Sequence, residues 1–193
     1  LNHWITDFLT YAKPVSTDRV AVKVDGILQE VILALKSDER STGIETEVVI
    51  RHDSRVLSDP ASIRQVLWNL LLNACEAMPD GGKLWIELDE QPDGMCQLRI
   101  TDTGGGIPQE NAERIFDPFF TTKPSGTGLG LATAYRMVSE LGGTLKFHSL
   151  HGEGTTFYVE LPTEAKVRAE KAAVKPTEEE KTKSETDALP AEV

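Results

Sequence analysis

The chain has 193 residues, which is long enough for one well-packed domain with short appendages. Its formal net charge is −11 and no stripe of Lys or Arg offsets it, which argues against nucleic acid as the main partner. No apolar run approaches the roughly 20 residues that a transmembrane helix needs, and no signal peptide is recognisable.

The first predicted element is a helix over residues 1–13, where apolar side chains recur at helical spacing before Pro14. The chain begins inside this pattern with Leu1, so we expect it to be a piece of a longer protein. A second helix is expected near residues 24–36. Residues 45–51 and 55–57 are then predicted to be strands.

A third helix has a strong start signal, with Asp59 as the expected N-cap and Pro60 at the first helical position. It should end near Met78. Its single cysteine, Cys75, and the later Cys96 have neither a CxxC nor a metal-ligand spacing. We interpret both as buried, reduced thiols, which are typical of a cytoplasmic protein.

The segments 83–89 and 95–101 alternate apolar and polar residues and predict two strands joined by a hairpin turn at 91–94. A loop-rich stretch follows over residues 104–125. A short helix is expected within it, near residues 109–115.

A last helix is predicted over residues 128–141, followed by strands at 144–149 and 155–161. These elements place the main domain at 15–162, as an α/β two-layer sandwich in which three helices cover one face of a mixed sheet. Residues 163–193 contain no aromatic and few large aliphatic side chains, so they are expected to form a disordered tail.

Asn69 and Asn73 are four residues apart and therefore lie on one face of the third helix. Amide oxygens suit a Mg²⁺ ion that already carries phosphate oxygens and water. Two solvated or capping asparagines are the alternative. Because the glycine-rich segments follow this helix directly, we favour the metal-binding interpretation.

Asp102 ends a predicted strand just before two glycines, Gly104 and Gly106. A carboxylate here can accept a hydrogen bond from an exocyclic amine such as adenine N6, while Ile107 offers an apolar wall. The glycines would let a base lie against the backbone. An ordinary turn-initiating aspartate is the alternative.

A second glycine cluster, Gly126-Thr-Gly-Leu-Gly130, precedes the last helix. Leu131 stands where a dinucleotide fingerprint needs glycine, and no GxxxxGK[ST] segment is present, so both familiar phosphate loops are excluded. The helix N-terminus still favours phosphate. Lys123 can reach a terminal phosphate as a point charge, although a solvated loop lysine is the alternative.

In chain order these segments resemble the sequence boxes of the catalytic, ATP-binding domain of sensor histidine kinases, which are members of the GHKL superfamily with the Bergerat fold. The boxes are residues 69–78 (N), 102–108 (G1), 116–123 (F), 126–131 (G2) and 152–157 (a G3-like strand pair). The resemblance spans about residues 24–162. Within the family, the sequence is similar to kinases of the nitrogen-regulation type.

The resemblance implies that Asn73 is the main Mg²⁺ ligand, that Asn69 assists it, and that Asp102 binds adenine with Thr155 as a water-linked second contact. Lys123 would hold the phosphates with the backbone of the G2 box. The implied cofactor-binding set is Asp102, Gly104, Gly106, Ile107, Thr122, Gly126, Thr127, Gly128, Leu129, Gly130, Leu131 and Thr155. Glu76 departs from the pattern, because many members carry a basic residue there.

Residues 1–14 resemble the end of the second helix of a dimerisation and phosphotransfer domain. The acceptor histidine belongs to the first helix and is expected outside this chain; His3 is not a candidate, because Trp4 follows it where the family has an acidic residue. The implied partners are that domain and a response regulator. We expect this piece to be monomeric and the intact protein, whose membrane attachment is left open, to be a homodimer.

Four functional interpretations have to be weighed. Asn69 stands where related hydrolases and serine kinases carry a glutamate as general base, and an amide cannot accept that proton. The sequence therefore favours a histidine kinase over a gyrase-, mismatch-repair- or chaperone-like ATPase and over an anti-sigma serine kinase. A non-catalytic nucleotide- or partner-binding module is the alternative from another class.

Overall fold

The computed structural model describes residues 8–13, 19–124 and 126–173. Its centre is a five-stranded sheet with the strand order β2-β4-β5-β7-β6. The strands are β2 (Ile44–Ile50), β4 (Gly82–Glu90), β5 (Met95–Asp102), β6 (Thr144–Leu150) and β7 (Gly154–Pro162). Only the β2–β4 pair within this sheet is parallel, so the predicted mixed sheet is confirmed.

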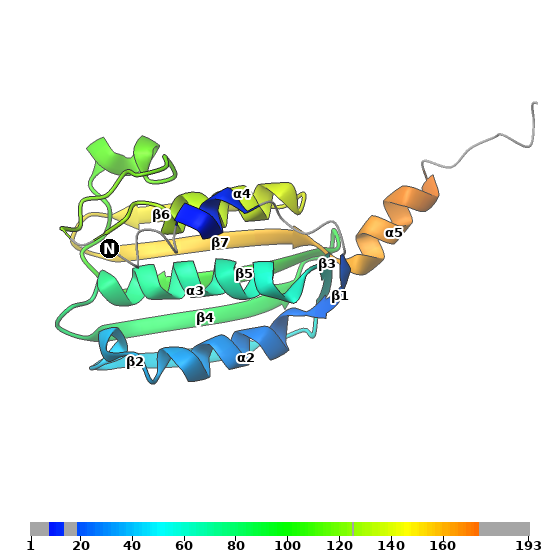
Figure 1. Cartoon of the computed structure of the whole chain (residues 1–193). Coiled ribbons are helices and arrows are strands. Elements are labelled where there is room, and N and C mark those ends of the chain that lie inside the picture. The colour runs from blue at the N-terminus through cyan, green and yellow to red at the C-terminus, as the bar shows by residue number, and fades with distance from the viewer. Residues whose placement is uncertain (1–7, 14–18, 125, 174–193) are drawn as a thin grey trace, which may run out of the picture.

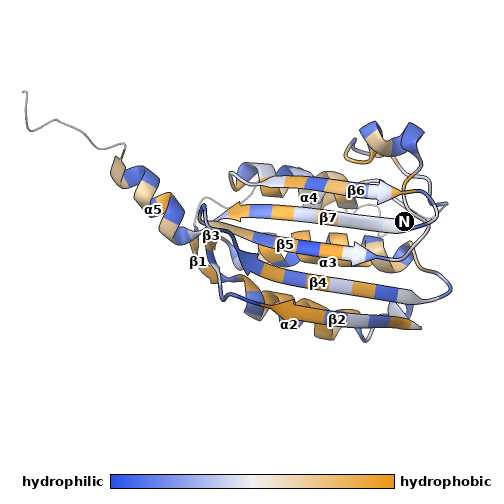
Figure 2. Cartoon of the chain, turned by 180° about the vertical axis from the view of Figure 1, so that it is seen from behind, coloured by the Kyte–Doolittle hydropathy of each residue, from blue (hydrophilic) through white to orange (hydrophobic). Residues whose placement is uncertain are grey.

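Three helices, α2 (Val24–Leu35), α3 (Pro60–Glu76) and α4 (Gly130–Glu140), lie side by side on one face of the sheet (Figure 1). Alternate residues of each strand point toward them, as the period of two requires. In β4, Leu84 and Ile86 are buried beneath the helices, whereas Trp85 between them lies on the opposite side. Figure 2 shows that side of the sheet, which none of the helices in the described part of the chain covers. The two-layer sandwich is therefore confirmed.

The start of α3 follows the predicted capping chemistry. Asp59 Oδ1 accepts hydrogen bonds from the backbone N–H groups of Ala61 (2.8 Å) and Ser62 (3.1 Å). The preceding strand β3 (Arg55–Ser58) pairs antiparallel with β1 (Val20–Lys23) in a separate two-stranded sheet. Strand β1 was not predicted, because four residues are too few to show an alternating pattern.

Residues 164–173 are helical, which corrects the start of the expected disordered tail. They form helix α5 (Glu164–Ala173), in which Arg168 and Glu164 form an ion pair one turn apart (2.5 Å). The segment buries little, as its composition predicted, but Ala, Glu, Lys and Arg are strong helix formers. Helix propensity, the hydrogen bond from the Lys166 N–H to Thr163 Oγ1 (3.3 Å) and that from Lys166 Nζ to the Asp93 carbonyl oxygen (2.9 Å) together form this helix without a core of its own. Residues 174–193 lie outside the described part of the chain.

Residues 8–12 are helical, in agreement with the predicted first helix, whose residues 1–7 are outside the described ranges. This short helix ends against α4, where Arg136 donates to the carbonyl oxygens of Tyr11 (2.8 Å) and Lys13 (2.9 Å). Across the described ranges, the helices are all too short or too polar to cross a lipid bilayer.

Candidate functional site

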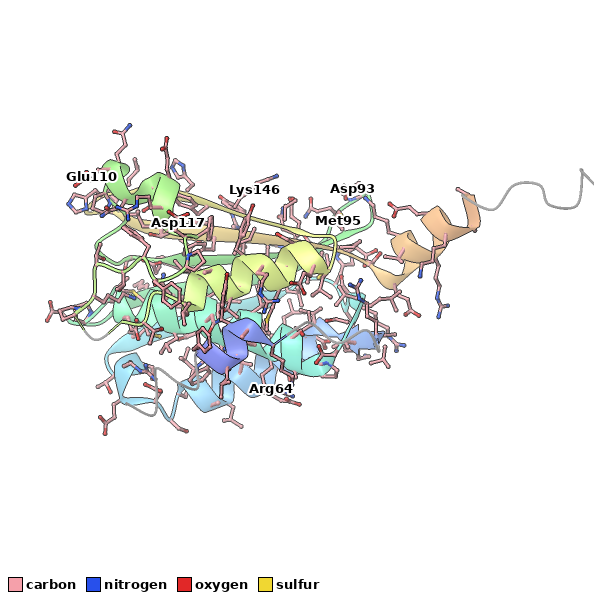
Figure 3. The ribbon with its side chains drawn as sticks, turned by 45° about the horizontal axis from the view of Figure 1, so that its top comes forward. Arg64, Asp93, Met95, Glu110, Asp117 and Lys146 are labelled. Carbon is pink, nitrogen blue, oxygen red and sulfur yellow. The ribbon has the colours of Figure 1, made fainter. Side chains whose placement is uncertain are left out.

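The predicted site residues lie together at one end of the sheet. There β5 ends at Asp102, α3 ends at Glu76 and α4 begins at Gly130. The segment between β5 and α4 contains the 3₁₀ helix η2 (Gln109–Arg114) and lies over this end, as Figure 1 shows. In Figure 3 its residues Glu110 and Asp117 are far from Asp93 and Met95, which mark the opposite end of the sheet.

Asp102 is a buried carboxylate, and one of its two oxygens accepts no hydrogen bond from the described residues. It is 2% exposed, and its Oδ1 accepts from the backbone N–H groups of Gly104 (2.9 Å) and Thr155 (3.3 Å). Its Oδ2 is buried and meets no donor among the described residues. Burial raises the pKa of Asp102, and the two backbone hydrogen bonds oppose that rise. An unsatisfied buried oxygen is costly, so it is suited to accept a donor from a ligand.

Thr155 lies directly opposite Asp102 in the pairing of β5 with β7. Its hydroxyl is 2.9 Å from the hydroxyl of Ser149, which also accepts from the N–H of Ile107 (2.8 Å). Ser149 therefore joins the G3-like strand pair to the turn after β5. Sequence reasoning missed Ser149, because a single serine in an alternating strand carries no distinguishing signal.

The glycines of the first turn serve the packing of the chain on itself. A Cβ at Gly104 would lie 2.5 Å from the carbonyl oxygen of Ala77 at the end of α3. A Cβ at Gly106, where φ is +65°, would lie 2.1 Å from the carbonyl oxygen of Leu150. These glycines hold the turn close to both neighbours, which adds a structural role to the expected approach of a base.

Asn69 connects α3 with α4. Its Nδ2 donates to the carbonyl oxygen of Gly130 (2.9 Å), and its Oδ1 accepts from Gln65 Nε2 (2.9 Å). Both polar atoms of this amide are thus engaged within the protein. Asn69 lies one turn before Asn73 on α3, and the second lone pair of its Oδ1 remains available to a metal ion.

Asn73 lies one turn further along α3, beside a row of alternating charges. Its Oδ1 accepts from Lys123 Nζ (3.0 Å), which also pairs with Glu76 Oε2 (2.7 Å). The other oxygen of Glu76 contacts Arg40 (3.3 Å), and Arg40 is held by Asp38. We call these five residues the Glu76 cluster. Sequence reasoning missed Asp38 and Arg40, which are distant in the chain.

The second glycine cluster leads into α4. Gly128 has φ of +68°, and a Cβ there would lie 2.4 Å from the carbonyl carbon of Phe119, whose N–H donates to the Gly128 carbonyl oxygen (3.0 Å). Helix α4 begins at Gly130 without a side-chain cap, so its first N–H groups favour an anion. The remaining predicted residues of this segment are Thr122, Gly126, Thr127, Leu129 and Leu131, of which Thr127 and Leu129 are buried.

Aromatic contacts anchor the segment between β5 and α4. Phe116 stacks on Tyr135 of α4 with ring centroids 4.8 Å apart and meets Phe147 of β6 edge-on at 5.8 Å. Phe120 lies under the guanidinium of Arg114 at 4.4 Å. The F box therefore carries apolar anchors on either side of its exposed residues.

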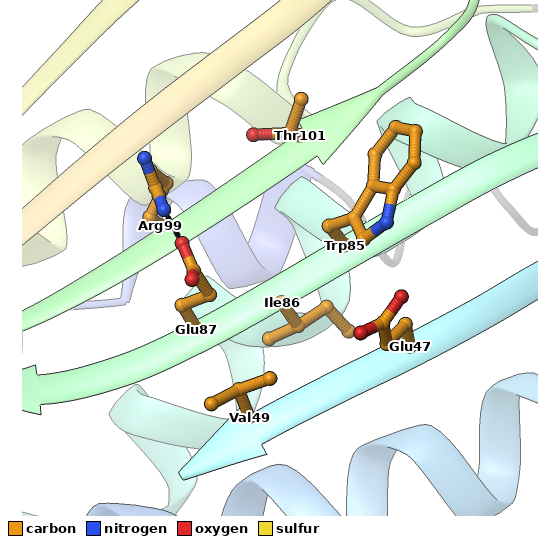
Figure 4. A pocket seen from close by; sticks show the side chains of 7 residues that line it. All are labelled: Glu47, Val49, Trp85, Ile86, Glu87, Arg99 and Thr101. Atoms are coloured by element: carbon orange, nitrogen blue, oxygen red, sulfur yellow. Dashed lines mark ion pairs between the residues drawn. The ribbon is translucent and has the colours of Figure 1, made fainter. Parts of the chain in front are cut away.

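Two other hollows contain none of the predicted site residues. One lies on the uncovered face of the sheet, around Trp85, Val49 and the ion pair of Glu87 with Arg99 (Figure 4). The other lies between α2 and α3. No group of three His, Cys, Asp or Glu residues within the described ranges could hold a metal ion. A metal at this end of the sheet would instead take an amide oxygen, phosphate oxygens and water.

A protein-family model described as "Histidine kinase-, DNA gyrase B-, and HSP90-like ATPase" matches residues 58–165. Curated relatives include the sensor histidine kinase ZraS of Salmonella typhi, 34% identical over 86% of this chain and 36% of the relative. Sporulation kinase E of Bacillus subtilis is 31% identical over 82% of this chain and 22% of its own length. The chain thus spans only about a third or less of these relatives.

Solved structures of similar fold include the catalytic domain of histidine kinase ThkA, with a TM-score of 0.68 and 32% identity over 76% of this chain and 96% of that one. The mycobacterial sensor histidine kinase MprB has a TM-score of 0.68 and 29% identity over 75% and 97%. Full-length ShkA in complex with AMPPNP has a TM-score of 0.73 and 26% identity over 83% and 35%.

Proposed function

This chain belongs to the family of histidine kinase-, DNA gyrase B- and HSP90-like ATPases, and we propose that it is the ATP-binding catalytic domain of a two-component sensor histidine kinase. The observation that carries the proposal is the orphaned Oδ2 of the buried Asp102. It sits at the end of the sheet that α4 reaches with its uncapped N-terminus. One ligand with an exocyclic amine and phosphates would satisfy both features.

In this proposal the adenine N6 amine donates to Asp102 Oδ2, and Thr155 makes a second contact through water. Ile107 lies against the base. The backbone at the start of α4 binds phosphate oxygens, and Lys123 supplies a positive charge to them. These assignments are supported by the register that sets Thr155 beside Asp102 and by the backbone N–H groups at Gly130.

The residues present also fit a Mg²⁺ ion. Asn73 Oδ1 already accepts a cationic group, the ammonium of Lys123, so its oxygen is accessible to positive charge. We assign Asn73 as the main protein ligand, and Asn69 as an assisting one through the second lone pair of its Oδ1. When bound, Mg²⁺ would neutralise charge on the phosphates.

The nucleophile must be activated by another domain. Asn69 has no proton-accepting carboxylate, and its amide is engaged with Gln65 and Gly130. Water activation is therefore disfavoured, which supports a kinase over an ATPase. The bond between the γ-phosphorus and the β–γ bridging oxygen breaks, ADP leaves, and a nitrogen–phosphorus bond forms on a histidine. An acidic residue of the phosphotransfer domain takes the ring proton.

The proposed partners are that histidine-bearing phosphotransfer domain, located upstream in the intact protein, and a response regulator that receives the phosphoryl group on an aspartate. We propose that the intact protein is a homodimer, that this part alone is monomeric, and that it resides in the cytoplasm, where ATP is available. Residues 8–12, packed against Arg136, support a direct helical connection to the phosphotransfer domain.

A transfer assay tests the function. The chain is mixed with the phosphotransfer domain of its parent and with ATP labelled on the γ-phosphate. Label on that domain that is acid-labile and base-stable is expected, and Asp102→Ala should abolish it. Asp117→Asn, an exposed change in the same segment, should not. Nucleotide binding without transfer would favour the non-catalytic module, and rapid hydrolysis by the chain alone would favour the ATPase.

A further inference from the structure

Lys123 donates a hydrogen bond to Asn73 Oδ1, the oxygen atom that would bind Mg²⁺ under the proposed function. Its Nζ lies 3.0 Å from Asn73 Oδ1 and 2.7 Å from Glu76 Oε2. A Mg²⁺ ion held by the same oxygen would lie next to the ammonium group. Two cations so close together repel strongly in a partly shielded site. The lysine and the metal ion therefore compete for Asn73.

Glu76 is held in place from its other side. Arg40 contacts Glu76 Oε1 at 3.3 Å, while its own guanidinium is fixed by Asp38, whose oxygens accept from Nε (2.8 Å) and Nη2 (2.7 Å). This leaves Glu76 Oε2 directed to Lys123. The side chains of Lys123 and Glu76 are 35% and 31% exposed, so water screens the pair only in part.

The charges of the Glu76 cluster balance before a nucleotide arrives. Asp38 and Glu76 are offset by Arg40 and Lys123. When Lys123 turns toward the phosphates, the Glu76 carboxylate is left facing additional negative charge. A divalent cation on Asn73 would compensate for that loss, so departure of the lysine and arrival of the metal favour each other.

We infer that Glu76 positions Lys123 as an internal cation on Asn73 in the nucleotide-free protein, and that Mg²⁺ displaces this lysine toward the phosphates of ATP. The inference rests on the proposed function and deepens it. Glu76 is a positioning residue that acts through Lys123. Glu76 thereby makes ATP binding depend more strongly on Mg²⁺.

A double-mutant cycle tests the inference by calorimetry of ATP binding with and without Mg²⁺. The proteins are the wild type, Glu76→Gln, Lys123→Met and the double variant. Glu76→Gln frees Lys123 for phosphate without metal, so metal-free affinity should rise about threefold to tenfold. The ratio of affinities with and without Mg²⁺ should fall accordingly. In the Lys123→Met background, Glu76→Gln should raise metal-free affinity by clearly less than in the wild-type background, because only the direct repulsion of phosphate by Glu76 is then relieved.

Two controls separate the effect from general charge removal. Glu30→Gln removes the same charge from α2, where Glu30 pairs with Arg64 at 2.8 Å, and should leave the ratio unchanged. Acetylation of lysines in the nucleotide-free protein, followed by mass spectrometry, gives a readout independent of ATP. Lys123 should react faster in Glu76→Gln than in the wild type, relative to the exposed Lys83 of the same sample.

The outcomes are distinguishable once circular dichroism has shown that each variant is folded. If the wild type binds no ATP at millimolar concentration with Mg²⁺, the proposed function and this inference both fail. If the wild type binds but Glu76→Gln leaves metal-free affinity unchanged, the inference alone fails. The inference also fails if Glu76→Gln raises metal-free affinity as much in the Lys123→Met background as in the wild type. Glu76 would then act by repelling phosphate directly and not through Lys123.

Discussion

The side chain of Asn69 donates to the carbonyl oxygen of Gly130 over 2.9 Å and so joins the middle of α3 to the first residue of α4. The same position decides whether a general base is present. An amide here both removes the base and supplies a donor that a carboxylate lacks. The residue that favours the kinase interpretation is therefore also part of the framework that orients the N-terminus of α4, the proposed phosphate site.

Asn69→Asp should lower the free energy of unfolding by about 1–3 kcal/mol, because the Gly130 carbonyl loses its donor and faces a carboxylate. Urea unfolding followed by circular dichroism measures the change. Gln65→Ala is the matched control, since Gln65 touches only the other end of the amide. It should cost less than Asn69→Asp. Equal costs for the two variants would contradict a structural role for the Asn69–Gly130 bond.

Asp102→Asn should weaken ATP binding at least about tenfold. The new amide can keep accepting from Gly104 and Thr155 through its oxygen, but its NH₂ group would then meet the adenine amine, so that two donors face each other. Calorimetry in the presence of Mg²⁺ measures the loss. Unchanged affinity would show that Asp102 does not accept a hydrogen bond from the adenine amine.

The same variant reveals the ionisation of Asp102 in the folded protein. Burial raises its pKa above the ordinary value of 3.8, so the unfolded chain releases this proton at lower pH than the folded one. The stability that Asp102 contributes relative to asparagine is therefore complete below that ordinary value and is lost as pH rises through the raised pKa. Urea unfolding of both proteins between about pH 4 and pH 7 should show the wild type losing stability relative to Asp102→Asn. If the wild type instead gained stability relative to Asp102→Asn as the pH rises, the pKa of Asp102 would not be raised.

Gly106→Ala should be far more destabilising than Gly152→Ala, although both glycines have positive φ, +65° and +85°. A Cβ at Gly106 would lie 2.1 Å from the Leu150 carbonyl oxygen, whereas nothing lies within 4 Å at Gly152. We expect about 1 kcal/mol at Gly152 from the backbone conformation alone and more than about 3 kcal/mol at Gly106. Thermal unfolding compares them, and similar midpoints would exclude the steric explanation.

The two thiols should be unreactive in the folded protein. Burial raises the pKa of Cys75 to about 11 and that of Cys96 to about 12, so almost no thiolate is present near neutral pH. Alkylation by iodoacetamide at about pH 8 should be at least roughly a hundredfold slower than that of glutathione and should recover in urea. Rapid labelling without denaturant would mean that α3 or β5 opens readily.

Most elements could be predicted from the sequence, because their signals are local. Asp59 and Pro60 mark the start of α3 through contacts within one turn. Helix α5 is an exception. The lack of core-forming residues after Pro162 predicts disorder, but helix propensity together with the contacts of Thr163 and Lys166 forms a helix over residues 164–173. Strand β1 was missed, because it is defined by its partner β3 and not by its own four residues.

The order of the elements, the glycine-rich turns and the carboxylate at the end of β5 could be predicted from the sequence, because each depends on residues that are neighbours in the chain. Which distant side chains contact one another became visible in the folded structure. Asn69 and Gly130 are 61 residues apart, Lys123 and Asn73 are 50 apart, and Arg40 and Glu76 are 36 apart. Such contacts follow from sheet register and from helix packing over the sheet, which no local pattern encodes.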